Sequence, residues 1–188
     1  MNVWFIRSNG NTLHNHPGTK IYVPGEPPQF PNRDFNFRLD CLEGGFARVG
    51  WPAAGDLRIA GWRTRGRDAY GAAFTSLYMG YLEGFLTIRP GDIVLTPSDV
   101  SRYDVHVGMV SKATDTSSLT PYFYRFEPGS GDRFENAHRV PVAWARKPSG
   151  EWTSIMVEGL GGLWLRGFAR VETAKTDVLR QAAEVFPP

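Results

Sequence analysis

Residues 90–110 read PGDIVLTPSDVSRYDVHVGMV, and residues 120–144 read TPYFYRFEPGSGDRFENAHRVPVAW. In the first segment, a Pro-Gly-Asp turn precedes an apolar run at 93–95 of strand length and β-branched character. From Tyr103 to Met109, apolar residues then alternate with polar or small ones, which is the period of a half-buried strand. The second segment adds β-rich runs at 122–126 and 138–144, separated by turn residues. These consecutive short strands predict a meander that curls into a small barrel.

The rest of the chain adds both strands and helices to this barrel. Further strands are expected at 3–7, 46–51, 152–157 and 163–170. Helices are expected at 35–42, stopped by the glycine pair at 44–45, at 70–85, where apolar residues recur every three or four positions, and at 171–186, closing the barrel. Length and the lack of an internal repeat predict one α+β domain over residues 1–188. A proline-rich insertion at about 11–35 interrupts it, because so many prolines block regular pairing.

Composition limits the classes of function. Hydrophobic residues make up 41% and aromatic residues 13%, enough for a core, and the net charge of +2 provides no strongly cationic coat. The single cysteine, Cys41, excludes an intrachain disulfide and a cysteine zinc site. The sequence shows no leader and no apolar run of about 18 residues, so we expect a cytoplasmic protein without a membrane partner.

Several motifs recur in a fixed order. They are VWFIRSNG at 3–10, LEGGFARVGWPAAGDLR at 42–58, PGDIVLTPS at 90–98, HVGMV at 106–110 and HRVPVAW at 138–144. This series resembles the N-terminal domains of Mrr-like restriction endonucleases and their stand-alone relatives, which look like members of the PUA superfamily of EVE, YTH and SRA-type readers. The likeness covers about 3–51 and 86–144, with a weaker echo at the C-terminal helix, and the insertion at 11–35 departs from it.

The resemblance implies a fold and a function. The fold would be a small PUA-like β-barrel, or pseudobarrel, flanked by helices, with a cleft that receives one flipped nucleobase. The function would be nucleic-acid binding by a reader of modified bases, linked to restriction–modification or defence. In the relatives a separate nuclease domain cuts, so the resemblance favours a non-catalytic module.

A base-binding pocket needs flat walls and a few polar groups for the base edge. Trp51 is the first candidate for a wall, because it ends an expected strand and leads into a loop, and the further candidates are Trp62, Tyr122, Tyr124 and Trp144. Of these, Tyr122 and Trp144 look most like core residues, and Trp51 and Trp62 least. The candidates for the edge stand just beyond the ends of strands and are Ser8, Asn9, Asp56, Ser98 and Asp99. The alternative interpretations are core packing for the aromatic residues and turn capping for the polar ones.

Arginine supplies the candidate phosphate contacts, because its planar guanidinium binds phosphate oxygens in pairs. The candidates are Arg58, Arg63, Arg65 and Arg67, which surround Trp62 in an expected loop at 52–67, and Arg139 on an expected strand. A solvated loop remains the alternative interpretation of the arginine group.

Catalytic motifs are missing from the sequence. No carboxylate stands two positions before any of the four lysines, as a PD-(D/E)xK nuclease requires, and no phosphate-binding GxxxxGK[ST] loop occurs. His14 and His16 lack the context of a metal nuclease, and we expect no metal or cofactor.

Two alternatives stay open beside the reader. A small ASCH-like ribonuclease would use His106, His138 and Arg139 for acid–base work at a phosphodiester. A protein-interaction module would use the proline-rich segment to dock a partner such as a nuclease or a helicase. The partner of the reader itself would be DNA or RNA.

Overall fold

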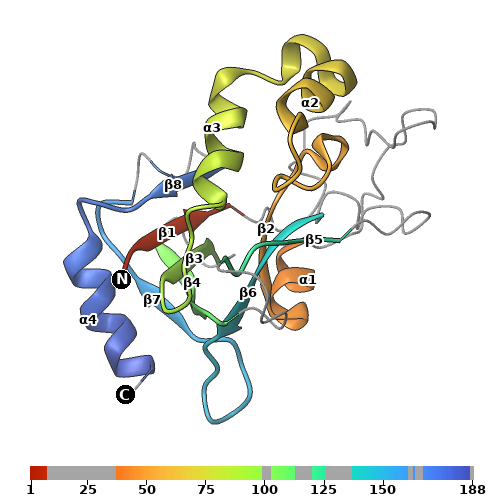
Figure 1. The fold of residues 1–188 in the computed structure, drawn as a ribbon. Helices are drawn as coiled ribbons and strands as arrows, with labels where there is room; N and C mark the ends of the chain where they lie inside the picture. Colours follow the sequence, from red (N-terminus) through yellow and green to blue (C-terminus); the bar gives the residue numbers. More distant parts are fainter. Residues whose placement is uncertain are drawn as a thin grey trace.

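The structure is a computed structural model, which describes residues 1–7, 37–98, 103–112, 120–125, 137–160, 163 and 167–186. In these ranges the protein is mixed α+β, with a curled β-sheet and helices around it (Figure 1). The expected α+β class with a curled sheet and flanking helices is thus confirmed at this level. The predicted insertion at 11–35 lies outside the described residues.

The sheet brings together strands that are far apart in the sequence. Its strands are β1 (Val3–Ile6), β2 (Phe46–Val49), β3 (Ile93–Pro97), β4 (Asp104–Val110), β5 (Phe123–Tyr124), β6 (His138–Trp144), β7 (Ser154–Met156) and β8 (Phe168–Arg170). They run in the order β2-β6-β4-β3-β1-β8, with β5 added to β6 and β7 added to β4. The pair β1 and β3 is parallel, with Val3 opposite Ile93, and the other described pairs are antiparallel.

The expected meander is therefore wrong in its connections. A parallel pair needs a long crossover, and here the whole segment between β1 and β3 provides it. The period-2 pattern identifies a strand and its buried face, but it carries no information on which strand lies beside it. The position of β1 in the middle of the sheet could not be predicted from that pattern.

The sheet bends until its two sides approach each other. Strands β1 and β2 are in contact although three strands separate them in the sheet order. The sheet thus forms a half-barrel, and the seam between the end of β1 and the end of β2 stays open for other elements.

In the described part of the chain, four α-helices flank this sheet: α1 (Phe37–Gly44), α2 (Trp62–Tyr70), α3 (Ser76–Phe85) and α4 (Lys175–Val185). Short 3₁₀ turns lie at Pro52–Ala54 and Gly71–Ala73. The single helix expected at 70–85 and the loop expected at 52–67 are both corrected. Gly71, with φ of 56°, ends α2, and α3 starts anew five residues later. The predicted stop of the first helix is confirmed, because Gly45 follows α1 with φ of 67°.

Strand β1 is buried on both faces, and each face contacts a different helix. Trp4 and Ile6 belong to a core that includes Phe85 of α3, whereas Val3 belongs to a second core that includes Val178 of α4. The expected closing helix therefore covers the sheet as α4, on the face opposite to α3 (Figure 1).

Asp92, in the turn before β3, ties the start of the chain to this turn. Its carboxylate is 3% exposed and accepts hydrogen bonds from the backbone N–H of Asn2 at 2.7 Å, the indole of Trp4 at 2.9 Å and the N–H of Arg89 at 3.1 Å. Burial alone would raise the pKa of Asp92, but these hydrogen bonds outweigh it and hold the pKa below its ordinary value. The aspartate of the Pro-Gly-Asp turn thus joins the start of β1 to the turn that precedes β3.

No helix in the described ranges is long and apolar enough to cross a membrane.

Candidate functional site

A cleft of about 100 Å³ opens at the seam of the half-barrel. The ends of β1 and β2, helix α3 and the residue before β8 line it. The lining residues are Arg7, Arg48, Val49, Gly50, Trp51, Tyr78, Tyr81, Leu82 and Gly167. The cleft is larger than a site for one or two waters and smaller than the roughly 300–1,000 Å³ of cavities that hold whole small molecules. Its volume is that of part of a ligand rather than of a whole small molecule.

Trp51 forms one wall of the cleft in an unusual backbone conformation. Its φ of 74° and ψ of 49° are left-handed, and it is the only non-glycine residue with positive φ among the described residues. Such a conformation costs a bulky residue about 1–3 kcal/mol and persists only where its surroundings enforce it. Residues of this kind cluster at functional sites, so the outlier itself draws attention to the cleft.

Aromatic rings surround the half-buried indole of Trp51. The ring of Tyr78 lies 4.5 Å away between centroids, Tyr70 meets it edge-on at 4.8 Å and Phe74 at 5.4 Å. Tyr81 continues the row from Tyr78, at 5.9 Å. The wall is thus built jointly by Trp51, by the residues that end and follow α2, and by α3.

The segment 51–59, here called the Trp51 loop, is held from several elements. Ring side chains bond its backbone at four points: His138 Nε2 to Trp51 O at 3.0 Å, Tyr124 Oη to Pro52 O at 3.0 Å, Ala53 N to Tyr70 Oη at 2.9 Å and Leu57 N to Tyr122 Oη at 3.2 Å. Four rings from α2, β6 and the segment around β5 thus fix the loop. This network provides the surroundings that the backbone of Trp51 requires.

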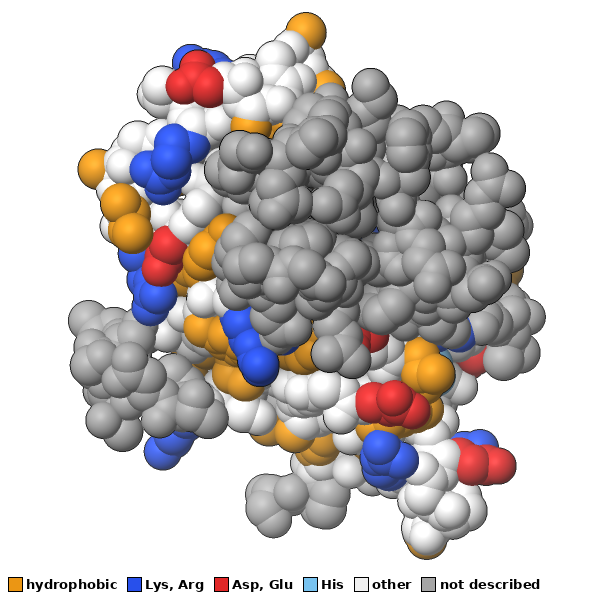
Figure 2. Space-filling view, turned by 90° about the vertical axis from the view of Figure 1, so that its right-hand side faces the viewer, with side chains coloured by type: hydrophobic (Ala, Val, Ile, Leu, Met, Phe, Trp, Pro, Cys, Tyr) orange, Lys and Arg blue, Asp and Glu red, His pale blue; other side chains and the backbone are white. Residues whose placement is uncertain are grey.

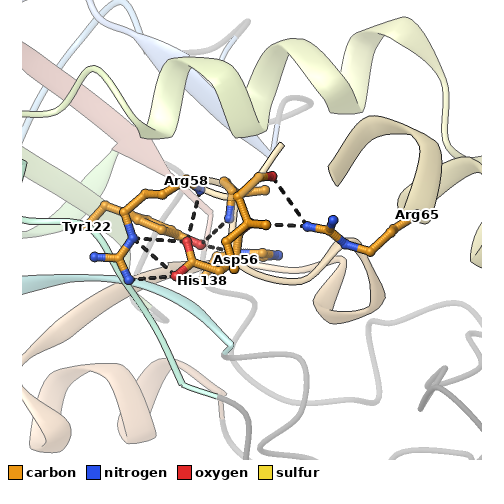
Figure 3. A network of polar contacts seen from close by, with 7 residues as sticks. Asp56, Arg58, Arg65, Tyr122 and His138 are labelled. Atoms are coloured by element: carbon orange, nitrogen blue, oxygen red, sulfur yellow. Dashed lines mark hydrogen bonds and ion pairs between the residues drawn. The ribbon is translucent and has the colours of Figure 1, made fainter. Parts of the chain in front are cut away.

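His138, on β6, is fully buried and engaged at both ring nitrogens. Its Nδ1 lies 2.9 Å from the hydroxyl of Tyr122 (Figure 3). Its Nε2 bonds the carbonyl of Trp51. Burial lowers the pKa of His138 to about 4, against the hydrogen bond to Trp51 and the charge of Asp56, which act in the opposite direction. Burial also raises the pKa of Tyr122. Both rings are therefore neutral near pH 7.

Asp56 and two arginines stiffen the outer side of the loop (Figure 3). The guanidinium of Arg58 pairs with the carboxylate of Asp56 at 2.6 Å. Burial alone would raise the pKa of Asp56, but the hydrogen bonds and charge of Arg58 outweigh it and keep the pKa below its ordinary value. Arg65 approaches from α2 and donates to the carbonyls of Ala54 at 3.0 Å and Ala60 at 2.9 Å.

A glycine of α2 allows Phe74 to support Trp51. A Cβ on Gly66 would lie 2.6 Å from Cζ of Phe74, closer than atoms approach in proteins. We expect Gly66→Ala to lower the free energy of unfolding by about 2 kcal/mol, because the Phe74 ring must move. Gly80→Ala is the matched control, since a Cβ at this helical position of α3 meets nothing within 4 Å.

Urea unfolding of the two variants measures this difference. Gly80→Ala should leave stability unchanged or raise it by up to about 1 kcal/mol, through helix propensity alone. Equal effects of the two substitutions would contradict the close packing of Phe74 on α2.

The structure disperses the residues predicted for base binding. Trp51 lines the cleft, whereas Trp62 is 5% exposed and meets Phe74 edge-on at 6.4 Å, behind the wall. The expectation that Trp62 is one of the less core-like tryptophans is therefore wrong. Asp56 is paired with Arg58, and buried Ser98 donates its hydroxyl to the carboxylate of Asp104 at the base of a hairpin. Ser8, Asn9 and Asp99 lie outside the described residues.

The predicted core role of two other aromatic residues is confirmed. Tyr122 is 2% and Trp144 8% exposed, and the Trp144 indole donates to the carbonyl of Cys41 at 3.0 Å. Cys41 is itself buried in α1.

The predicted phosphate-binding arginines lie on α2, on the Trp51 loop and on β6. Arg63 pairs with Glu83 of α3 at 2.6 Å, Arg67 is exposed on α2, and Arg139 is buried with its guanidinium 4.5 Å from the ring centre of Phe46. Arg58 and Arg65 make the loop contacts described above. On the described part of the face in Figure 2, basic side chains are scattered, several beside acidic ones, and form no single patch.

Sequence reasoning missed most of the cleft. Tyr78 and Tyr81 were recognised only as part of an apolar helical stripe, and Arg7 and Arg48 were not singled out. The spacing of three between the two tyrosines places them on one face of α3, which is a usable signal. The contribution of β1 could not be seen, because it depends on the curl of the sheet.

The arrangement suits binding better than proton transfer. The described walls of the cleft combine aromatic rings with two arginines and contain no histidine or carboxylate. Among the described residues, no group of three or more His, Cys, Asp or Glu side chains could hold a metal ion.

Comparison with known proteins adds no family to this picture. No protein-family model matches the chain, and no curated protein matches it in sequence.

Proposed function

We propose that the chain is a non-catalytic, PUA-like nucleic-acid reader that holds one flipped or modified base in the Trp51 cleft. It would act in the cytoplasm on DNA or RNA, in restriction or defence. The observation that carries the proposal is the left-handed Trp51, whose indole forms the wall of an open cleft instead of packing inside the core. The curled sheet and the ordered sequence motifs support the same reading.

The dimensions of the cleft support a single ring as ligand. Bases that leave a stack are held between flat side chains, and each stacked base contributes about 1–3 kcal/mol. Trp51, Tyr78 and Tyr81 provide such surfaces on the Trp51 loop and on α3. The volume admits a ring and leaves the sugar and phosphates at the mouth.

The charge of the cleft supports a neutral or anionic ligand. Among the described residues that line it, the charged ones are Arg7 and Arg48. An aromatic cage for a methylated ammonium group works by attraction of a cation to ring faces, and two guanidinium groups would oppose it. A nucleobase followed by phosphate meets no such penalty.

The ribonuclease alternative finds little support in the positions of its candidate residues. His138 is buried with both nitrogens engaged, and Arg139 is 6% exposed. His106 is half-buried, with Nδ1 at 3.3 Å from the carbonyl of Thr153. A general acid or base must reach its proton within about 3 Å, and the two buried residues do not reach solvent. The docking segment of the protein-interaction alternative lies outside the described residues.

Oligonucleotide binding tests the proposal. Fluorescence anisotropy at low salt would compare labelled single-stranded DNA, duplex DNA and RNA, each in pairs that differ by one modified base. We expect the protein to prefer one member of a pair and Trp51→Ala to reduce this preference by at least about tenfold. Salt-dependent binding to the backbone should remain, because Trp51 carries no charge.

Trp152→Ala is the matched control. Trp152 is a half-buried tryptophan outside the cleft, stacked under Arg146 at 3.4 Å. This variant should keep the preference of the unchanged protein. Absence of binding to every oligonucleotide would overturn the proposed function, and equal loss of preference and backbone affinity in Trp51→Ala would overturn the assignment to this cleft.

A further inference from the structure

His138 lies directly behind the cleft but does not line it. Its side chain hydrogen bonds to one of the lining residues named above, from Nε2 to the carbonyl oxygen of Trp51 at 3.0 Å. The side chain is fully buried on β6, a strand in the middle of the sheet order. It therefore connects a rigid part of the fold to the residue with the strained backbone.

The hydrogen-bond partners of His138 assign one tautomer. The Trp51 carbonyl can only accept, so Nε2 must carry the proton. The N–H of Leu57 donates to the oxygen of Tyr122 at 3.2 Å, which leaves the Tyr122 hydroxyl to donate to Nδ1 at 2.9 Å. The chain Leu57, Tyr122, His138, Trp51 then has every donor matched to an acceptor. A neutral ring with its proton on Nε2 is the form that satisfies it.

The hydrogen bond from His138 restrains the strained backbone of Trp51. A residue in the left-handed region returns to a relaxed conformation unless neighbouring groups hold both its backbone and its side chain. The rings of Tyr70, Phe74 and Tyr78 contact the indole, and His138 holds the carbonyl. Rotation of that carbonyl would change ψ of Trp51 and shift the start of the 3₁₀ turn at Pro52–Ala54.

We propose that His138 is a positioning residue for the cleft: it fixes the carbonyl of Trp51 and so holds the indole as the wall against which a base stacks. As a statement about ligand binding, this inference rests on the proposed function. As a statement about the position of Trp51, it does not, and the two can be tested apart.

Two substitutions separate the polar role from the filling of space. His138→Leu fills the same space with an apolar side chain of similar size and removes both hydrogen bonds. His138→Gln keeps an N–H donor for Trp51 and a carbonyl acceptor for the Tyr122 hydroxyl, about as far apart as the ring nitrogens. Tyr122→Phe is a second variant that leaves the bond from His138 to Trp51 in place, because it removes the donor to Nδ1 and the acceptor for the N–H of Leu57. If His138→Leu fails to fold, Tyr122→Phe still tests whether this hydrogen-bond chain positions Trp51.

Fluorine NMR of protein labelled with 5-fluorotryptophan reads the indole directly. The chain has six tryptophans, and Trp51→Phe identifies the resonance of Trp51. We expect this resonance to shift or broaden in His138→Leu, to move less in Tyr122→Phe, and to return to its original position in His138→Gln. Preference for the modified base should fall about tenfold in His138→Leu and recover in His138→Gln.

Asp92→Ala is the control for general destabilisation. Asp92 contacts the indole of Trp4, so this variant should move the Trp4 resonance and leave that of Trp51 in place. An unmoved Trp51 resonance in both His138→Leu and Tyr122→Phe, or a failure of His138→Gln to restore it, would overturn the inference. If the resonance behaves as expected but no oligonucleotide binds, the positioning of Trp51 stands and the proposed function fails.

Discussion

Replacing Asp92 with alanine should lower the free energy of unfolding by about 3 kcal/mol. The carboxylate is buried and accepts from the N–H groups of Asn2 and Arg89 and from the indole of Trp4. A hydrogen bond to a charged group contributes about 1.5–3 kcal/mol, and its loss leaves a buried donor without a partner. The three donors belong to two segments, the start of the chain and the turn before β3, so the junction between β1 and β3 should loosen.

Chemical denaturation at pH 7 measures this loss. The stability of Asp92→Asn should lie between those of Asp92→Ala and the unchanged protein. The amide keeps one acceptor oxygen but brings N–H groups into a site already filled with donors. Asp68→Ala is the surface control, since Asp68 is exposed on α2, and it should change stability by less than about 0.5 kcal/mol. A loss below about 1 kcal/mol in Asp92→Ala would contradict the role of this turn.

The elements of the fold could be predicted to a large extent from local patterns. The period-2 alternation gave β4, the run at 93–95 gave β3, and β6 matches the expected 138–144 at both ends. Each of these signals depends on residues within one strand. The helix boundary at Gly71 was missed because the apolar spacing continues across it, although the backbone there turns away.

The topology could not be predicted in the same way. That β1 lies between β3 and β8 depends on contacts between residues about 90 and more than 160 positions apart, and the pairing of β2 with β6 depends on contacts about 90 positions apart. The sequence pattern of a strand buried on both faces fits several places in a sheet. The cleft inherits this difficulty, because it exists only where the ends of β1 and β2 approach.

Of the residues that form the candidate site, the sequence predicted Trp51 but not the residues that hold it in place. Trp51 was chosen because it follows a strand, and it does line the cleft. Trp62 is expected in a loop, but it lies at the start of α2 and its side chain packs into the core. His138 gave no signal beyond a histidine within a strand, since its importance comes from Tyr122 and Trp51, which are distant in the sequence.

Acidification should reveal the buried His138 as a loss of stability between about pH 6.5 and pH 4. The unfolded chain takes up a proton on this ring near its ordinary pKa of 6.5, whereas burial lowers the pKa of His138 in the folded protein to about 4. Between these values the unfolded state binds more protons, so stability falls as the pH falls. The full difference amounts to about 3 kcal/mol, with a slope of up to about 1.4 kcal/mol per pH unit.

The titratable groups around the His138 ring do not change protonation between about pH 6.5 and pH 4, so they do not mask its effect on stability. Facing it are Tyr122 and Tyr124, whose pKa values burial raises, and Asp56, whose pKa lies below its ordinary value because the Arg58 contacts outweigh burial. The stabilising effect of Asp56 is therefore present above its unfolded pKa of 3.8 and is lost only at lower pH. The tyrosines titrate far above neutrality.

His138→Gln isolates the contribution of the ring, because glutamine keeps both hydrogen bonds and does not titrate. Urea unfolding at several pH values from 4 to 7 should give a slope that is smaller in His138→Gln than in the unchanged protein, whatever the stability of the variant at pH 7. A parallel decline in both proteins would mean that other groups cause the acid sensitivity. A steeper decline in the unchanged protein would show that the neutral ring is a condition of the native state, and hence that the carbonyl of Trp51 is held by an uncharged donor.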